Sequence, residues 1–177
     1  MAVHALQGRM ITCERLTEEA IHVEQELLQE TVGSQDQVAA AHGGFNHVLF
    51  APSGDITVRP VILPADRLAE LSGSLMLFYT GIKRTAAQVA TSYVPTIDAK
   101  RRQLRQIRGL VDEALEILCG SSDLADFGGL LHESWMVKRS LSDMVSNDVV
   151  DDIYEEARAA GAMGGKITGA GGGGFLL

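Results

Sequence analysis

The sequence predicts an α+β protein, and three observations indicate this class. Amphipathic helical stretches and short β-type stretches both occur along the 177 residues, mixed rather than regularly alternating. The apolar fraction of 46% and the charged fraction of 21% are typical of a soluble globular protein with enough chain to bury a core. The chain shows no internal repeat and no long linker, which favours a continuous folded structure.

The first third of the chain predicts two helices and a hairpin. A helix begins after Thr12, a suitable N-cap, and runs to Gly33 with an apolar stripe at Leu16, Ala20, Val23 and Leu27. A short helix follows from about Gln35 to His42, before paired glycines. The segment FNHVLFAPSGDITVRPVIL predicts two strands joined at a Pro-Ser-Gly-Asp turn. The apolar run GSLMLFYTG then predicts a short buried strand.

The remainder of the chain predicts four helices and a glycine-rich end. The helices are expected from Arg84 to just before Pro95, from Asp98 to Cys119, from Phe127 to Val145 and from Asn147 to Gly161. The second of them carries an apolar face, formed by Leu104, Ile107, Val111, Leu115 and Leu118. The third carries another, through Leu130, Val137, Leu141 and Met144.

The closing segment GGKITGAGGGGFLL predicts an ordered loop between two strands. Consecutive glycines let a backbone approach an anion and turn several N–H groups toward it, and Lys166 and Thr168 would add a charge and a hydroxyl. A flexible tail is the alternative, but β-competent residues flank the run and serines are lacking. The spacing is not that of a GxxxxGK[ST] phosphate loop, because the lysine precedes the glycines.

Charge and composition exclude several classes of function. The formal net charge of −8 argues against nucleic-acid binding. Five basic residues between Lys100 and Arg108 predict a solvated helix face, since no aromatic residue is interleaved with them. The sequence shows no membrane span, no signal pattern, no paired-histidine metal spacing and no CxxC among its two cysteines. We therefore expect a cytoplasmic protein with reduced thiols.

Four segments resemble the GHMP small-molecule kinases: the closing segment, VEQELLQETVGSQDQVAAAHGGFN from Val23, YTGIKRTA from Tyr79 and LLHESWMVKRSLS from Leu130. Together they are similar to the sugar kinase branch that contains D-glycero-D-manno-heptose 7-phosphate kinases. The resemblance implies a GHMP kinase-like α+β fold. It divides the chain into a partial N-terminal catalytic domain at residues 1–62 and a ferredoxin-like C-terminal domain with an incomplete sheet at residues 63–177.

The resemblance also implies the site residues and the cofactors, ATP and Mg²⁺. Asp36 matches the catalytic aspartate and would accept or orient the proton of the attacking sugar hydroxyl, while Glu24 matches a glutamate that binds Mg²⁺. Without the resemblance, Asp36 is an ordinary capping residue after a glycine turn, and Glu24 is an ordinary polar helix residue. The predicted substrate-binding residues are Gly33, Asp36, Thr80, Gly81 and Arg84; for Arg84 a solvent-facing helix start remains an equal alternative. The predicted nucleotide-binding residues are Lys166, Thr168, Gly169, Ala170, Gly171, Gly172 and Gly173.

The resemblance implies phosphorylation of a sugar hydroxyl, with the anomeric hydroxyl of D-glycero-D-manno-heptose 7-phosphate as the substrate position. Fucose or a mevalonate-type substrate is the alternative within the enzyme class, and a non-catalytic helical interaction module is the rival class. The expected partners are the sugar phosphate and ATP, with no nucleic acid or membrane, and a homodimer is left open. No segment matches the family's PxxxGLGSSS-like phosphate loop, and the chain resembles a fragment cut at both ends. We expect this polypeptide alone to be inactive.

Overall fold

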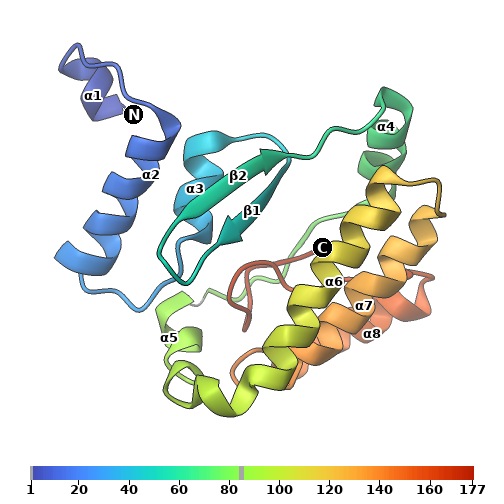
Figure 1. Ribbon diagram of the computed structural model, residues 1–177. Helices are drawn as coiled ribbons and strands as arrows, with labels where there is room; N and C mark the ends of the chain where they lie inside the picture. Colours follow the sequence, from blue (N-terminus) through green and yellow to red (C-terminus); the bar gives the residue numbers. More distant parts are fainter. Residues whose placement is uncertain (1, 84–85) are drawn as a thin grey trace. The chain divides into compact units, whose positions relative to one another are not determined.

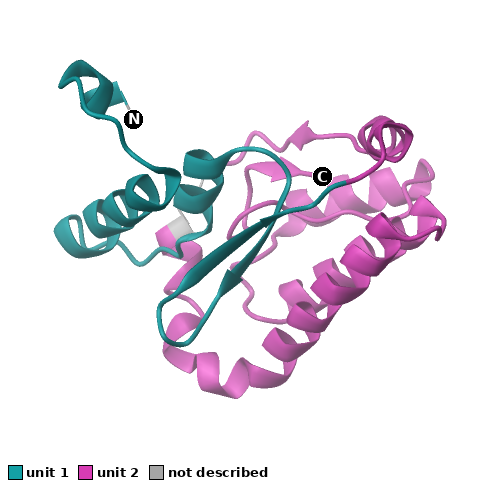
Figure 2. Cartoon of the chain, turned by 45° about the horizontal axis from the view of Figure 1, so that its top comes forward, with its two compact units in different colours: residues 1–62 teal, residues 63–177 magenta. Residues whose placement is uncertain are grey.

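The chain forms two compact units, Met1–Ile62 and Leu63–Leu177, which are coloured separately in Figure 2. The computed structural model describes residues 2–83 and 86–177. Each unit combines helices with a two-stranded antiparallel sheet, so the predicted α+β class is confirmed. The assignment of residues 1–62 and 63–177 to two kinase domains stays a prediction.

Unit 1 contains helices and one β-hairpin (Figure 1). In chain order its elements are α1 (Ala2–Leu6), α2 (Cys13–Ile21), the π-helical segment η1 (His22–Leu27), α3 (Gln35–His42), β1 (Asn46–Phe50) and β2 (Ile56–Pro60). The Thr12 hydroxyl accepts a hydrogen bond from the Arg15 N–H at 3.2 Å, which confirms Thr12 as the N-cap of α2.

The short helix and the hairpin of unit 1 follow the sequence expectation closely. Helix α3 stops at paired glycines, where Gly43 and Gly44 have φ values of 60° and 72°. Strands β1 and β2 pair antiparallel from Asn46↔Pro60 to Phe50↔Ile56. The predicted turn residues connect these strands, and the whole hairpin is therefore confirmed.

Unit 2 contains the longer helices, and Figure 1 shows α6, α7 and α8 running side by side. Its elements are α4 (Ala65–Ser74), β3 (Phe78–Tyr79), α5 (Ala86–Ala90), the 3₁₀ segment η2 (Val94–Lys100), α6 (Arg101–Cys119), α7 (Leu124–Arg139), α8 (Asp148–Ala159) and β4 (Phe175–Leu176). Side chains cap two of the helices: Asp123 accepts from the Ala125 N–H at the start of α7, and Asn147 from the Val150 N–H at the start of α8.

The core of unit 2 is built around Trp135, which is completely buried. Its ring packs against Tyr154 of α8 with a centroid distance of 6.3 Å. The Tyr154 hydroxyl forms a hydrogen bond of 2.5 Å with Nδ1 of His132, so the polar end of this buried ring has a partner. Ile167 and Leu176, from the end of the chain, complete the same cluster. The C-terminal segment is thus part of the core.

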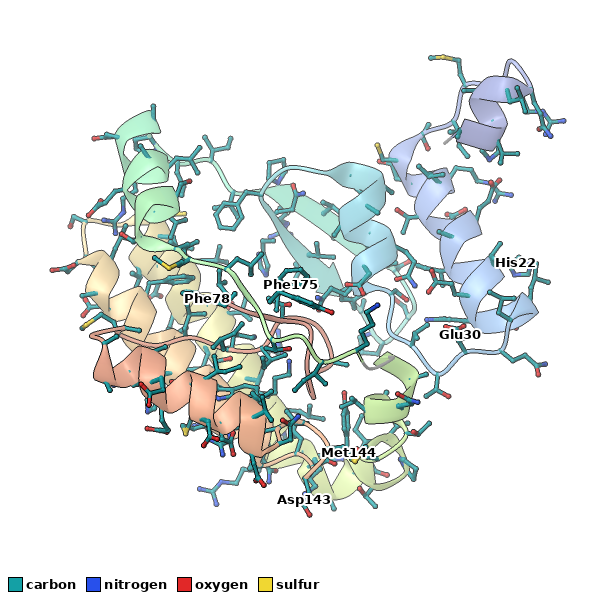
Figure 3. The ribbon with its side chains drawn as sticks, turned by 180° about the vertical axis from the view of Figure 1, so that it is seen from behind. His22, Glu30, Phe78, Asp143, Met144 and Phe175 are labelled. Atoms are coloured by element: carbon teal, nitrogen blue, oxygen red, sulfur yellow. The ribbon has the colours of Figure 1, made fainter. Side chains whose placement is uncertain are left out.

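The last residues of the chain form a hairpin that enters this core. Lys166 and Leu177 exchange two backbone hydrogen bonds of 2.9 and 3.0 Å, and Ile167 bridges Leu176. Strand β4 pairs antiparallel with β3 on its other side, and Phe78 and Phe175 lie close together in Figure 3. The glycine-rich segment is therefore an ordered connection between β-type residues, as the sequence predicted.

Several predicted helix limits are wrong. The first helix does not reach Gly33, because the helical stretch ends at Leu27 and Gln29 takes a positive φ of 54°. The helix expected from Asp98 begins at Arg101, after the 3₁₀ segment η2. The helix expected over 127–145 begins three residues earlier, since Asp123 supplies its cap, and ends at Arg139.

Other expectations for unit 2 also need correction. The helix predicted to run up to Pro95 ends at Ala90, while Arg84 lies outside the described residues. The run GSLMLFYTG contributes a strand only at Phe78 and Tyr79, and both are exposed. Helix α4 was not predicted. On α6 the apolar face is rotated, so that Leu110 is buried whereas Val111 is 42% exposed.

Two general expectations can be compared with the described residues. Within residues 2–83 and 86–177, no helix has both the length and the apolar character needed to cross a bilayer. Cys13 and Cys119 are both free thiols, in agreement with the reduced cysteines expected from the sequence.

The chain passes close to the backbone of α7 in unit 2. A Cβ added to Gly164 would lie 1.9 Å from the Gly128 carbonyl oxygen, so only glycine fits where the chain passes α7. A Cβ on Gly128 would lie 2.6 Å from Cβ of Met163, from the same passing segment. The neighbouring Gly129 is exposed, and a Cβ there would meet nothing within 4 Å. These adjacent glycines provide a matched test of the packing.

We predict that Gly128→Ala lowers the free energy of unfolding by about 1–3 kcal/mol, because the added methyl group overpacks the contact with Met163. Gly129→Ala should instead raise it by about 0.5–1 kcal/mol, since alanine is the better helix former. Urea unfolding of both variants measures the difference. Equal effects of the two substitutions would contradict the close approach of residue 163 to α7.

Candidate functional site

The predicted carboxylates lie in unit 1. Glu24 is in η1 and is half-buried, whereas Asp36 is in the first turn of α3 and is exposed. Figure 3 shows His22 and Glu30 around the end of the helical stretch that carries Glu24. The predicted nucleotide-binding residues lie in unit 2.

Gln37 lies next to both predicted site carboxylates of unit 1, Glu24 and Asp36. It is the residue after Asp36, it is only 6% exposed, and its amide Nε2 donates to Oε2 of Glu24 at 2.5 Å. A second amide holds the connection between the two helices: Gln25 Nε2 donates to the Val32 carbonyl oxygen at 3.0 Å and to the Ser34 hydroxyl at 3.2 Å. The backbone that leads to Asp36 is therefore positioned by side chains of η1.

This arrangement fits a single-carboxylate magnesium ligand. The bond from Gln37 occupies Oε2 of Glu24 and orients the carboxylate, while Oε1 has no hydrogen bond within the described residues. Mg²⁺ prefers hard oxygen ligands and retains several waters, so one carboxylate oxygen from the protein is sufficient beside phosphate oxygens. No group of three or more metal-ligating side chains occurs in the described part of the chain.

No contact within the described part of unit 1 requires a glycine at position 33. Its φ is not positive, and a Cβ added there would meet nothing within 4 Å. The predicted role of Gly33 in substrate binding thus remains a prediction.

The glycine loop, residues 168–174, is held in place from three distant positions in unit 2. The Gly172 N–H donates to the Val145 carbonyl oxygen at 2.7 Å, and the Gly174 N–H donates to the Ile82 carbonyl oxygen at 3.0 Å. Asn147 Nδ2, at the start of α8, donates to the Gly172 carbonyl oxygen at 3.0 Å. These bonds give the loop one conformation and use two of its N–H groups internally.

Some of the glycines are needed for this packing. A Cβ on Gly173, whose φ is 157°, would lie 2.8 Å from Cβ of Ile82. A Cβ on Gly171, whose φ is 114°, would lie 2.8 Å from the Val145 carbonyl oxygen. The glycine content of the loop therefore has a structural reason in addition to any contact with a ligand.

The loop still presents hydrogen-bond donors that no described residue uses. The N–H groups of Gly169, Ala170, Gly171 and Gly173 donate to no acceptor in the parts of unit 2 that the structure describes. Unpaired backbone N–H groups gathered in a tight loop are typical of anion-binding sites. The structure thus brings the predicted nucleotide-binding residues together in one donor-rich hairpin.

The two hydroxyl groups near the loop are committed to its structure. Thr80 Oγ1 donates to the Gly174 carbonyl oxygen at 2.9 Å, and Thr168 Oγ1 donates to the Phe175 carbonyl oxygen at 3.2 Å. Gly81 has a φ of 76° and turns the chain between β3 and Ile82. The hydroxyls of Thr80 and Thr168 therefore support the loop rather than offer their protons to a ligand.

Two lysines lie at the start of the loop. Lys138 Nζ, from α7, donates to the Ile167 carbonyl oxygen at 3.1 Å and also to the Gly169 carbonyl oxygen. Lys166 is half-buried, and its ammonium group forms no hydrogen bond or ion pair with any described residue. Burial lowers the pKa of Lys138 to about 8, with a further contribution from the charge of Lys166, and burial also lowers the pKa of Lys166.

Sequence reasoning missed Gln37, Lys138 and Asn147, which all position predicted site residues. Gln37 carried no signal, because its burial follows from the packing of α2 on α3. The sequence did contain a signal for Lys138. It lies four residues after the buried Ser134 and three residues after the buried Trp135, so it shares their helix face. A lysine on a buried face is uncommon and could have been singled out.

A cavity of about 400 Å³ in unit 2 does not coincide with these groups. It lies between the end of α4, the start of α7 and the end of α8, and Phe127, Met163 and Leu176 contribute to its mainly apolar lining. None of the predicted site residues lines it. Its apolar character is unsuited to a polyphosphate.

A family model described as "GHMP kinases C terminal" matches residues 110–177. The match covers α7, α8, the glycine loop and most of α6. The resemblance drawn from the sequence motifs is therefore confirmed for this part of the chain.

Individual relatives extend the likeness to most of the chain. A D-glycero-α-D-manno-heptose 7-phosphate kinase of Campylobacter jejuni is 33% identical over 161 residues, which are 89% of this chain and 47% of that protein. A mevalonate kinase of Thermococcus sibiricus is 30% identical over 182 aligned positions, covering 99% of this chain and 50% of that protein. The chain thus spans about half the length of these curated relatives.

A solved structure shares the fold. The crystal structure of a D-glycero-D-manno-heptose 1-phosphate kinase from Bacteroides thetaiotaomicron superposes with a TM-score of 0.69 and 26% sequence identity. The superposition covers 99% of this chain and 47% of the crystallised one. The GHMP kinase-like fold expected from the sequence is confirmed.

Stability of the wild-type chain should depend on pH through Lys138. The unfolded chain holds this proton up to the ordinary pKa of 10.5, whereas the folded chain loses it near pH 8. Between these two pH values the unfolded state binds more protons than the folded state. The free energy of unfolding should therefore rise with pH, by about 3 kcal/mol in total. Urea unfolding between pH 7.5 and 10 measures this rise.

Lys138→Met should remove the part of this rise that comes from Lys138 and leave the part from Lys166, whose pKa burial also lowers. Lys100→Met, at the end of η2, should preserve the whole rise. An unchanged pH dependence in Lys138→Met would refute the assignment of the titration to this lysine.

Proposed function

We propose that this chain, whose residues 110–177 match the family model of the GHMP kinase C-terminal domain, contributes to ATP- and Mg²⁺-dependent phosphorylation of a sugar hydroxyl. The observation that carries the proposal is the 33% identity over 161 residues to a heptose 7-phosphate kinase. The proposed acceptor is the anomeric hydroxyl of D-glycero-D-manno-heptose 7-phosphate, and the proposed location is the cytoplasm. Fucose and mevalonate-type substrates are the alternatives.

The proposed roles follow from the chemistry of the residues. Asp36, exposed in the first turn of α3, would accept the proton of the sugar hydroxyl or orient it. Glu24, oriented by Gln37, would hold Mg²⁺, which neutralises phosphate charge when bound. The donors of the glycine loop, with Lys166, would contact phosphate oxygens. Gly33, Thr80, Gly81 and Arg84 remain proposed substrate neighbours.

These 177 residues contain no segment that resembles the PxxxGLGSSS-like loop, which holds most of the triphosphate in GHMP kinases. Phosphoryl transfer depends on positioning and on electrostatic stabilisation. We therefore expect the 177-residue polypeptide alone to show no measurable sugar kinase activity. ATP-dependent phosphorylation of heptose 7-phosphate by the purified chain would refute this expectation.

A chimera tests the proposed function directly. In it, the matched segment of the Campylobacter jejuni heptose kinase is replaced by this chain, so that the rest of a kinase is supplied. We expect ATP-dependent phosphorylation of D-glycero-D-manno-heptose 7-phosphate in preference to fucose and mevalonate. A folded chimera that binds no nucleotide and phosphorylates none of the three acceptors would favour the interaction module instead.

Within an active chimera, Asp36→Asn should lower kcat by about 10²–10⁴-fold, the usual contribution of a general base. The matched control is Asp66→Asn, which removes the same charge from the first turn of α4 in unit 2. Kinetics at saturating substrate separate kcat from binding. Wild-type kcat in Asp36→Asn would exclude the assigned role.

Glu24→Gln should act on the metal dependence. We expect the Mg²⁺ concentration for half-maximal activity to rise by about tenfold, because a carboxylate ligand becomes a neutral amide. Glu26→Gln, an exposed residue of the same segment η1, should leave the Mg²⁺ dependence unchanged. Titration of MgCl₂ at fixed ATP provides the measurement, and identical curves for both variants would remove Glu24 from the metal site.

A further inference from the structure

We propose that Lys138 and Lys166 together form a binding site for one phosphate group at the start of the glycine loop, with Lys138 also holding the loop in its binding conformation. The inference deepens the proposed function, on which it rests for the source of the phosphate. Lys138 lies within the segment LLHESWMVKRSLS, but the resemblance gave it no role, and its place beside the loop follows from the structure of unit 2.

The first argument is the geometry of Lys138. Its ammonium group donates to the carbonyl oxygens of Ile167 and Gly169, which flank Thr168. An ammonium group has three N–H donors, so one remains available. By bonding both carbonyls, Lys138 holds the Ile167–Thr168 and Gly169–Ala170 peptide groups. The Ala170 N–H, in the second of these groups, has no acceptor among the described residues.

The second argument is the lack of a counter-charge. Neither Lys138 nor Lys166 forms an ion pair with any carboxylate in residues 2–83 or 86–177. The acid on the adjacent helix α8, Asp151, is already bound by Arg139 at 2.5 Å and by the Ser146 hydroxyl at 2.5 Å. Partly buried cations without a carboxylate are unfavourable, and an anion would compensate both of them.

The third argument is the match to a phosphate rather than to a carboxylate ligand. A phosphate group carries close to two negative charges and three acceptor oxygens. The site offers two cationic side chains together with the unused N–H groups of Gly169, Ala170, Gly171 and Gly173. This number of charges and donors fits a phosphate monoester or the terminal group of a polyphosphate, and a nucleotide and a sugar phosphate share that chemistry.

The charges around Lys138 also determine how binding should depend on pH. Lys166 faces it from the hairpin, and the neighbouring charges on α7 and α8, Arg139 and Asp151, are paired with each other. Lys138 loses its proton near pH 8 in the absence of an anion. Affinity for a phosphate group should therefore fall as the pH rises above this value.

The test is isothermal titration calorimetry of the 177-residue chain with inorganic tripolyphosphate. At pH 7, Lys138→Gln and Lys166→Gln should each weaken binding by at least about tenfold, the usual loss for a charge-assisted hydrogen bond. Arg102→Gln removes an equal charge from the exposed face of α6 and should change affinity by less than about twofold. Separate titrations with ADP and with glucose 6-phosphate distinguish a nucleotide source from a sugar phosphate source.

The pH profile separates a charge role from a purely structural one. Between pH 7 and 9.5, wild-type affinity should fall more steeply than that of Lys138→Gln. The Lys166 side chain donates no hydrogen bond to the described residues, and the backbone bonds of Lys166 to Leu177 do not depend on it. Lys166→Gln therefore keeps the test valid even if Lys138→Gln unfolds. Wild-type affinity in Lys166→Gln, or no tripolyphosphate binding by the wild-type chain, would overturn the proposal. Because no sugar turnover is involved, this result is independent of whether the chimera is an active kinase.

Discussion

The hydrogen bonds that hold the glycine loop against its own unit are the interaction on which the rest of unit 2 depends. Val145 and Ile82 each accept an N–H from the loop, and Asn147 donates to Gly172. These contacts join the α7–α8 connection, the residues after β3 and the end of the chain. The loop lies between Ile167 and Leu176, which both belong to the core cluster of Trp135.

The same constraint explains why the loop combines rigidity with unused donors. A glycine can follow a path with positive φ and pass a carbonyl at distances that no Cβ permits, as at Gly171 and Gly173. The backbone therefore satisfies part of its hydrogen bonding internally and leaves the remaining N–H groups together. Lys138 strengthens this division, because it occupies carbonyl oxygens and leaves N–H groups available.

In unit 1, amide side chains hold the predicted ligand-binding residues in place. Gln25 holds the backbone before α3, and Gln37 orients Glu24. A glutamine can do this without adding a charge beside the carboxylate. In both units the residues that would contact ligand are thus held by neighbours that need not touch it.

Much of the fold could be predicted because its causes are local. Thr12 and Asn147 begin helices by capping N–H groups a few residues away, and the glycines after His42 end one. The hairpin of β1 and β2 follows from its turn residues. Errors occurred where distant contacts decide, as at the rotated face of α6 and the exposed strand β3.

The sequence by itself determined the α+β class, the ordered glycine hairpin and the likeness to GHMP kinases, because caps, turns and motifs are encoded by adjacent residues. Only the tertiary structure decided which donors of the loop stay unused, that Thr80 and Thr168 serve the loop, and that Lys138 lies beside Lys166. The physical reason is that a hydrogen bond or a charge depends on separation in space. Residues 138 and 166 are far apart along the chain and meet only after α7 and the hairpin have packed.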